Sequence, residues 1–326
     1  MSRLARRVAS AAVVTLFAFV CAASGQNEFQ PLTITDAHRY VAGQAQNAHY
    51  HILPVTTPEA RAAASRLNAS QRGSARPVTA DVQYSRPVAA VAGDPAPFRF
   101  GGDVQYYGGA TLTSTVFHSA FVNTTVACPP NACWGDPLGF SHDLFQSDFI
   151  HVMDQYTGAY GRYAVGTNFA VNYPVMPGVP LTEQDMQAIA YEVASKVGAG
   201  YGNMVHIFLP PGQDDCVVPG VCFSPDNPST FYFCANHGSF TSNIGDIVYS
   251  VEPFTDVPGC QMESGTPNGQ LADTINFGVG HETIEAISDP DPESGWANFI
   301  STSLYGSEIA DECVLFAPGQ GQGDDS

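Results

Sequence analysis

The chain has 326 residues and carries 31 Asp and Glu against 12 Lys and Arg, a formal net charge of −19 at pH 7. Such an acidic protein repels nucleic acid and anionic membrane surfaces, so neither is an expected partner. The hydrophobic fraction of 44% is sufficient for a core, and the length allows one large domain or two small ones.

The N-terminus has the pattern of a secretory signal peptide. Arg3, Arg6 and Arg7 precede an apolar run over residues 8–23, and small residues follow it up to the expected cleavage near residues 24–26. The run is short for a membrane span, and no later segment is long and apolar enough to be one. We therefore expect residues 1–25 to be removed and the mature protein to be secreted, with no membrane span.

Residues 26–100 differ in composition from the rest of the chain. They are rich in Ala, Pro, Gln, Arg and Val and show little periodicity, which is typical of a partly disordered segment. We interpret them as a linker, or as a basic pro-segment that covers an acidic active site. Beyond them, Arg162 and Lys196 are the only basic residues, so residues 101–326 form the acidic part of the chain.

Residues 101–326 alternate between strand-like and helical patterns. Strands are expected over residues 110–123, 163–171, 204–209, 231–236 and 246–254, and helices over residues 140–156, 182–197 and 271–288. Thr182 followed three residues later by Asp185 predicts an N-cap, and Asp289-Pro290 predicts the end of the last helix. This alternation predicts an α/β domain with a mixed sheet.

The cysteines of an exported chain are expected to form disulfide bonds. Cys128 lies close to Cys133 in sequence, and Cys216 lies close to Cys222, so each pair can close a loop. The three remaining cysteines of the mature chain cannot all pair with one another, so one of them is expected to be free: Cys234, Cys260 or Cys313.

The segment Gly-His-Glu-Thr-Ile-Glu over residues 280–285 carries the clearest chemical signal. On a helix, His281 and Glu285 lie one turn apart and face the same way, so they can hold one divalent ion. Glu282 can then act as the general base on a metal-bound water, as in HExxH zinc hydrolases, with Glu285 in place of the second histidine. Zinc is the expected ion, although one histidine with carboxylates makes a harder site. The alternative is a helix whose polar face carries these groups by chance.

A metal site needs a further protein ligand, and two acidic residues downstream can supply it. Glu308 follows Glu285 at an interval that fits a loop and a second helix. Asp311 can then accept a hydrogen bond from the other ring nitrogen of His281, or can itself be the ligand. The alternative is an ordinary exposed acidic turn.

Other candidates lie near this motif. Asp289, Asp291 and Glu293 form a D-P-D-P-E run that either binds Ca²⁺ or closes the helix as a solvated turn, and we favour the turn. His237 is either an alternative ligand or a donor to a developing oxyanion, and Tyr305 is a second candidate donor.

The sequence H-E-T-I-E-A-I-S-D-P, with Trp296 and E-I-A-D-E-C after it, resembles a group of exported bacterial proteins with the pattern HExxEAxTDP…W…EIxDxC. That group is distantly similar to the plant EXORDIUM, or phosphate-induced, proteins, in which a C-x-x-H-G-S stretch resembles C-A-N-H-G-S around His237. The resemblance implies that one site comprises His281, Glu282, Glu285, Glu308 and Asp311. The plant proteins are secreted, cell-wall-associated and growth-related, and they lack the His-Glu pair, so the scaffold also exists without this site.

We therefore predict a secreted zinc-dependent hydrolase, foremost a peptidase acting on peptide or protein substrates, with a zincin-like mixed sheet and an active-site helix. His281, Glu285 and Glu308 or Asp311 hold the metal, and Glu282 is the general base. The alternative is a non-catalytic exported module that binds cell-wall material or a partner. A glycosidase is disfavoured, because carboxylates three residues apart on one helix do not flank a sugar from two sides.

Overall fold

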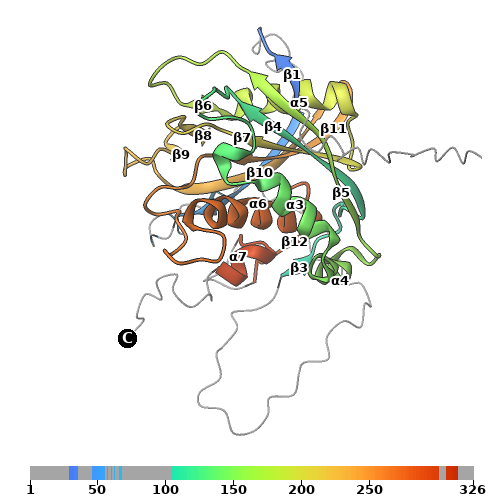
Figure 1. The fold of residues 1–326 in the computed structure, drawn as a ribbon. Coiled ribbons are helices and arrows are strands. Elements are labelled where there is room, and N and C mark those ends of the chain that lie inside the picture. Colours follow the sequence, from blue (N-terminus) through green and yellow to red (C-terminus); the bar gives the residue numbers. More distant parts are fainter. Residues whose placement is uncertain are drawn as a thin grey trace, which may run out of the picture.

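The computed structural model describes residues 29–35, 46–55, 57, 60, 62, 66–67, 104–300 and 306–314. These residues form a mixed α/β fold around a seven-stranded sheet with the order β1-β5-β4-β7-β11-β10-β2 (Figure 1). Neighbouring strands are parallel from β1 to β11, and β10 then runs antiparallel to both β11 and β2. The strands are β1 (Phe29–Thr33), β2 (Gln46–Pro54), β4 (Ser114–Val122), β5 (Arg162–Asn172), β7 (Asn203–Phe208), β10 (Phe233–Ser242) and β11 (Gly245–Glu252). The predicted α/β class with a mixed sheet is confirmed.

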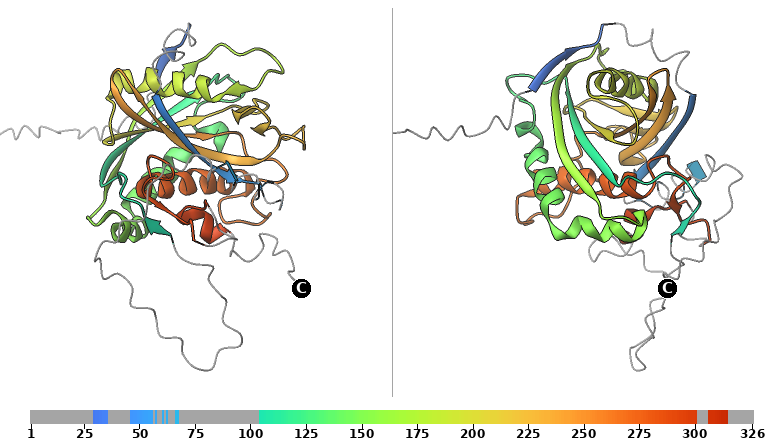
Figure 2. Two further views of the ribbon diagram at one scale, coloured as in Figure 1. Left: turned by 180° about the vertical axis from the view of Figure 1, so that it is seen from behind. Right: turned by 90° about the vertical axis from the view of Figure 1, so that its right-hand side faces the viewer.

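Helices cover both faces of this sheet. The strands curve around α5 (Glu183–Val197) on one side, and α6 (Gln270–Ser288) lies across the other side (Figure 2). Separate clusters of buried apolar side chains fill the two interfaces. The shorter helices on the α6 side are α3 (Pro137–Gln146), α4 (Asp154–Thr157) and α7 (Ile309–Val314), with the 3₁₀ helices η1 (Ala132–Trp134) and η2 (Asp148–Met153).

Local sequence signals set the limits of the two main helices. Thr182 and Asp185 form the capping box of α5, in which the Thr182 N–H donates to the Asp185 carboxylate at 2.7 Å. Helix α6 ends at Ser288, because the proline after Asp289 disfavours helical backbone at that position and Asp289 has φ −148°. Both helices match their predictions closely, and the chemistry-bearing residues of α6 lie in its C-terminal half.

Two small sheets complete the fold. One pairs β3 (Gln105–Tyr106) with β12 (Trp296–Ala297), and the other contains β6 (Leu181–Thr182), β8 (Asp215–Val218) and β9 (Val221–Phe223).

Three disulfide bonds link the described residues, as is typical of exported proteins. The predicted pairs Cys128–Cys133 and Cys216–Cys222 are both confirmed, and the third bond joins Cys234 to Cys260. The side chain of Cys313 and the signal peptide predicted over residues 1–25 lie outside the described part of the chain.

Part of the segment interpreted as a linker or pro-segment belongs to the main sheet, which corrects that interpretation for β1 and β2. Strand β2 pairs along its length with β10, and its Ile52 is fully buried. The average composition of residues 26–100 does not predict a short strand within them, because that strand is stabilised by pairing with a strand distant in the sequence. Residues 68–103 lie outside the described part.

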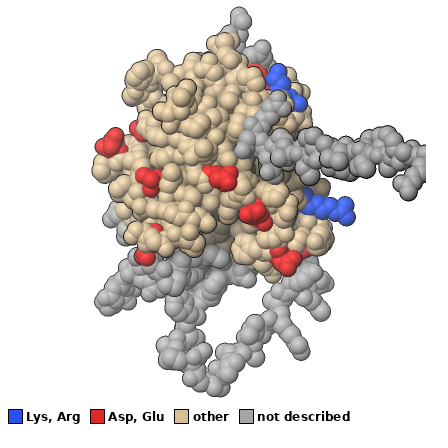
Figure 3. Space-filling model, viewed as in Figure 1, with Lys and Arg blue, Asp and Glu red and all other residues tan. Residues whose placement is uncertain are grey.

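The negative charge is not gathered into one patch on the face in Figure 3, where acidic side chains are scattered. Many acidic residues are instead buried, and they are described below. No helix in the described ranges is long and apolar enough to cross a membrane.

Candidate metal centre

Helix α6 brings three of the predicted site residues into the core. His281, Glu282 and Glu285 lie in its C-terminal half and expose at most 4% of their surface. His281 and Glu285 face the same way because they are one turn apart, and His281 Nε2 lies 3.0 Å from Glu285 Oε1. This histidine and this carboxylate therefore present a nitrogen and an oxygen to the same point.

The short helix α7 packs against α6 and adds two buried carboxylates. The Asp311 N–H donates to Glu285 Oε1 at 3.2 Å, and Asp311 Oδ1 lies 3.5 Å from His281 Nε2. Glu308 immediately precedes the helix, and its N–H donates to Asp311 Oδ2 at 3.2 Å. The first turn of α7 thereby holds Asp311 against the face of α6 that carries His281 and Glu285.

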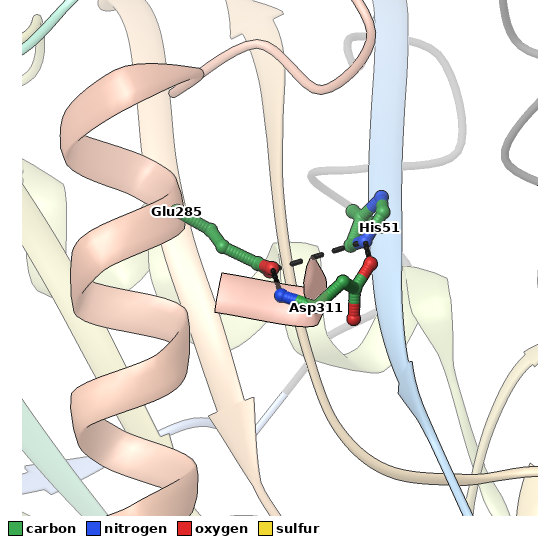
Figure 4. A group of neighbouring side chains, drawn as sticks. All are labelled: His51, Glu285 and Asp311. Carbon is green, nitrogen blue, oxygen red and sulfur yellow. Dashed lines mark hydrogen bonds and ion pairs between the residues drawn. The ribbon is translucent and has the colours of Figure 1, made fainter. Parts of the chain in front are cut away.

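A histidine that sequence analysis missed lies beside these helices. His51 is fully buried on β2, and together with Glu285 of α6 and Asp311 of α7 it forms the group in Figure 4. Its Nε2 lies 2.8 Å from Asp311 Oδ2 and 3.9 Å from Glu285 Oε2. Its Nδ1 lies 3.3 Å from Glu308 Oε1 and 3.5 Å from Glu293 Oε1. The two ring nitrogens of His51 therefore face two different sets of carboxylates.

His237 stands beside His51 on the neighbouring strand. The two residues are directly opposite each other in the antiparallel pairing of β10 with β2, and their ring centroids are 5.7 Å apart. His237 Nδ1 lies 3.0 Å from Glu282 Oε2, and Nε2 lies 3.2 Å from the backbone carbonyl oxygen of Asp289. Because a carbonyl oxygen only accepts, Nε2 carries the proton, and Nδ1 presents its lone pair toward Glu282.

The acidic run after α6 is divided between a turn and the buried site. Asp289 Oδ1 accepts a backbone N–H at 2.7 Å, and Asp291 accepts the Tyr201 hydroxyl at 2.5 Å, as expected for a turn that closes the helix. Glu293 instead exposes only 3% of its surface and has φ 73°, a left-handed conformation that is uncommon for a residue other than glycine. The local chain conformation thus directs the Glu293 carboxylate into the core.

The buried site, which we call the acidic cluster, comprises nine ionisable side chains: His51, His237, His281, Glu282, Glu285, Asp289, Glu293, Glu308 and Asp311. Isolated charges are costly to bury unless they are paired or bind a metal. Arg66, Arg162 and Lys196 are the basic residues within the described ranges, and all of them are exposed. Within those ranges, therefore, no arginine or lysine neutralises the acidic cluster.

Burial and mutual contact shift the pKa values of these groups. Burial raises the pKa of both Glu282 and Glu308 well above the usual value for glutamate, and it lowers the pKa of His237 to about 4. Burial also acts to lower the pKa of His51, but nearby carboxylates, Glu308 foremost, outweigh it and raise that pKa. Burial acts to raise the pKa of Asp311, but His51 outweighs it, so this carboxyl keeps a pKa below its usual range. The raised pKa of Glu282 and the lowered pKa of His237 favour a protonated carboxyl beside a neutral ring.

Several polar atoms of the acidic cluster have no hydrogen-bond partner. They are Nδ1 of His281, Oε1 of Glu282, Oε2 of Glu285, Oδ2 of Asp289 and Oε2 of Glu308. A buried polar atom left unpaired typically costs about 1–3 kcal/mol. Divalent cations bind such nitrogen and oxygen donors, so the residues present fit a metal ion.

Three groups of side chains can each hold a metal ion, because within each group one donor atom per residue lies within 4.8 Å of the others. The groups are His51, Glu285 and Asp311; His51, Glu293 and Glu308; and His237, Glu282 and Glu285. Of the predicted metal ligands, Glu285 and Asp311 share the first group, His281 contacts both of them, and Glu308 belongs to the second. His237 and Glu282 fall in the third. Tyr305 lies outside the described residues.

A cavity of about 630 Å³ opens beside the acidic cluster. Most of its lining is apolar and comes from α3, η2, α6 and α7. His281 lines it and also contacts Glu285 and Asp311, so this ring stands between the cavity and the buried donors.

No family model, no curated protein and no solved structure matches this chain. The resemblance to exported bacterial proteins stays a prediction.

Proposed function

We propose that the protein is an exported metal-dependent hydrolase, foremost a zinc peptidase of zincin-like design. The observation that carries the proposal is the convergence of His51 Nε2, Glu285 and Asp311 beside His281, which itself lines a cavity. One imidazole with two carboxylates is a donor set that zinc accepts, and three protein ligands leave a fourth position for water. Bound there, the ion would lower the pKa of a coordinated water to about 7 and polarise a carbonyl group.

The side chains around the ion have separate tasks in this proposal. Glu282 lies next to the metal donors on α6, and burial raises its pKa, which suits a group that takes up and returns a proton. His237 positions Glu282 through the contact at 3.0 Å, and its own ring is fixed by the Asp289 carbonyl. Tyr305 remains a candidate oxyanion donor.

The cavity indicates the class of substrate. Its apolar lining, which includes Phe140, Phe149 and Ile284, suits a bulky apolar side chain, and its few polar lining groups, His281 among them, suit the scissile bond. We therefore propose peptides with a large apolar residue next to the cleaved bond.

The test combines metal analysis with turnover. The mature chain is purified without added chelator, its metal content is measured, and a peptide library with varied apolar residues is digested by wild type, Glu282→Gln and Glu263→Gln. Glu263 is exposed, so its variant controls for the loss of one acid. We expect stoichiometric metal in all three proteins and a rate loss of about 10²–10⁴-fold for Glu282→Gln only. The absence of metal, or equal turnover by all three proteins, would refute the proposal.

Burial favours a second candidate, a non-catalytic module with a closed structural metal site. Among the members of the acidic cluster the greatest exposed fraction is 7%, at Asp311, and closed sites are typical of structural metals. Stoichiometric metal without turnover of any peptide, in wild type and variants alike, would support this candidate.

A further inference from the structure

His237 turns one ring nitrogen toward two glutamates of α6. Its Nε2 donates to the backbone carbonyl oxygen of Asp289 at 3.2 Å, so the lone pair of the neutral ring is on Nδ1. Nδ1 lies 3.0 Å from Glu282 Oε2 and 3.7 Å from Glu285 Oε2. All three side chains are fully buried. A lone pair and two buried carboxylates that face one another in this way need a cation or a proton between them.

The spacing of these atoms suits a metal ion. Two ligand atoms at about 2.0–2.1 Å from a tetrahedral zinc ion are about 3.3 Å apart, and the two distances from His237 Nδ1 fall on either side of that value. The donor atoms of Glu282 and Glu285 lie within 4.8 Å of each other. The bond from Nε2 to the Asp289 carbonyl fixes the tautomer and the ring, as the second nitrogen of a metal-binding histidine usually does.

Glu285 belongs both to this group and to the zinc centre proposed above. Its Oε2 lies 3.7 Å from His237 Nδ1 and 3.9 Å from His51 Nε2, and no hydrogen bond occupies this oxygen. With an ion on each side of Glu285, each histidine uses one lone pair: His51 at Nε2 and His237 at Nδ1. The proton of the His51 ring is then on Nδ1, which faces Glu308 Oε1 at 3.3 Å.

We propose that the protein binds a second zinc ion at His237, Glu282 and Glu285, and that this ion inhibits the proposed hydrolase. The second ion binds more weakly than the first, because it shares Glu285 and lies close to another dication. Once bound, it occupies Glu282, so this carboxylate no longer takes a proton from water at the first ion. The inhibition rests on the proposed function, whereas the binding does not.

The test counts zinc ions and follows turnover over the same range of free zinc. Full-length mature protein is stripped with chelator and titrated with Zn²⁺ by calorimetry, as wild type, His237→Ala and Glu282→Gln. We expect wild type to bind two ions, the second at least about 10-fold more weakly, and both variants to weaken the second ion by at least about 10-fold while they retain the first. Glu282→Gln preserves the shape of the side chain, so it serves if His237→Ala does not fold.

Turnover of apolar peptides gives the second readout. Wild-type activity should rise as the first ion binds and fall by at least about 10-fold as the second saturates. The residual activity of His237→Ala should not fall over that range. His206→Ala is the matched control for binding: His206 is a buried histidine of the same sheet that contacts Ser250 and Glu252, and it belongs to none of the possible metal groups among the described residues.

The outcomes separate this inference from the proposed function. Wild type that binds a single zinc ion would overturn the second site and leave the hydrolytic centre in place. A second ion that both variants still bind with wild-type affinity, or that only His206→Ala loses, would overturn the assignment to His237 and Glu282. A second ion that leaves turnover unchanged or raises it would overturn the inhibition. Two ions with no turnover at any zinc concentration would remove the proposed function alone.

Discussion

Replacing His51 with alanine should remove most of the stabilisation that zinc gives to the folded protein. His51 Nε2 lies against Asp311 and Glu285, and no other described residue brings a nitrogen as close to Asp311 Oδ2 as 2.8 Å. Without this imidazole, the metal donors at that point are two carboxylates and the neighbouring His281.

The expected magnitude follows from linkage. At free zinc 100 times the dissociation constant, binding to the folded state alone stabilises it by about 2.7 kcal/mol. If loss of the ligand weakens binding about 100-fold, the remaining stabilisation is about 0.4 kcal/mol. For a domain of this size 1 kcal/mol corresponds to about 2–4 °C. The rise in Tm on adding zinc should therefore fall from about 5–11 °C in wild type to about 1–2 °C in His51→Ala.

Differential scanning calorimetry with and without zinc measures this shift. Because each variant is compared with its own metal-free form, the loss of core packing at His51 cancels. His49→Ala is the matched control: His49 lies on the same strand and pairs with Ser239, and it makes no ion pair with the acidic cluster within the described residues. A full zinc shift in His51→Ala, or an equal loss in His49→Ala, would show that the reasoning about His51 is mistaken.

Three further predictions concern other parts of the molecule. Burial raises the pKa of Asp215 to about 7. Because this carboxyl ionises more readily in the unfolded chain, it lowers the free energy of unfolding progressively as pH rises from about 4 to about 7. The free energy of unfolding of Asp215→Asn should therefore rise relative to that of wild type by up to about 4 kcal/mol over that range. Urea denaturation at pH 4 and pH 8 checks this, and a difference that does not change with pH would contradict it. Phe149 lines the cavity but is 59% exposed, so Phe149→Ala should raise KM for apolar peptides while the free energy of unfolding changes by less than about 0.5 kcal/mol. Steady-state kinetics measure the KM, and chemical denaturation measures the free energy of unfolding. An unchanged KM would exclude the cavity as the substrate site. The Cys234–Cys260 bond spans a sequence separation of 26, so replacing both cysteines with serine should lower the free energy of unfolding by about 3 kcal/mol, as measured by chemical denaturation. A decrease below about 1 kcal/mol would contradict a stabilising role of this disulfide.

Local sequence determined much of the secondary structure. The α5 capping box depends on Thr182 and Asp185, which are three residues apart, and the end of α6 depends on the proline after Asp289. Such signals act through bonds and steric clashes between near neighbours, so they are visible without knowledge of the fold. The alignment of His281 with Glu285 is of the same kind, because helical periodicity alone puts both on one face.

The rest of the acidic cluster depends on contacts between distant segments. His51 lies in a stretch whose composition predicted a linker, and it becomes a site residue only because β2 pairs with β10 in the register that sets it opposite His237. A shift of one residue in that register would turn His51 to the other face of the sheet. The sequence of β2 alone does not predict which strand it pairs with. The alternating His49 and His51 in a strand-like run were the available signal, but alternation alone does not distinguish a buried ligand from a surface histidine.

The sequence by itself therefore determined that α6 presents His281, Glu282 and Glu285 together, and that Glu308 and Asp311 follow at a distance suited to one site. Only the tertiary structure decided which carboxylate faces which histidine: Asp311 lies at Nε2 of His51, and Glu308 at Nδ1. It also decided that the Asp289 to Glu293 run, predicted as a solvated turn, sends Glu293 into the core. The physical reason is that helical spacing is set by the backbone within one turn, whereas a metal site is set by the packing of a strand, a turn and two helices that meet only in the folded chain.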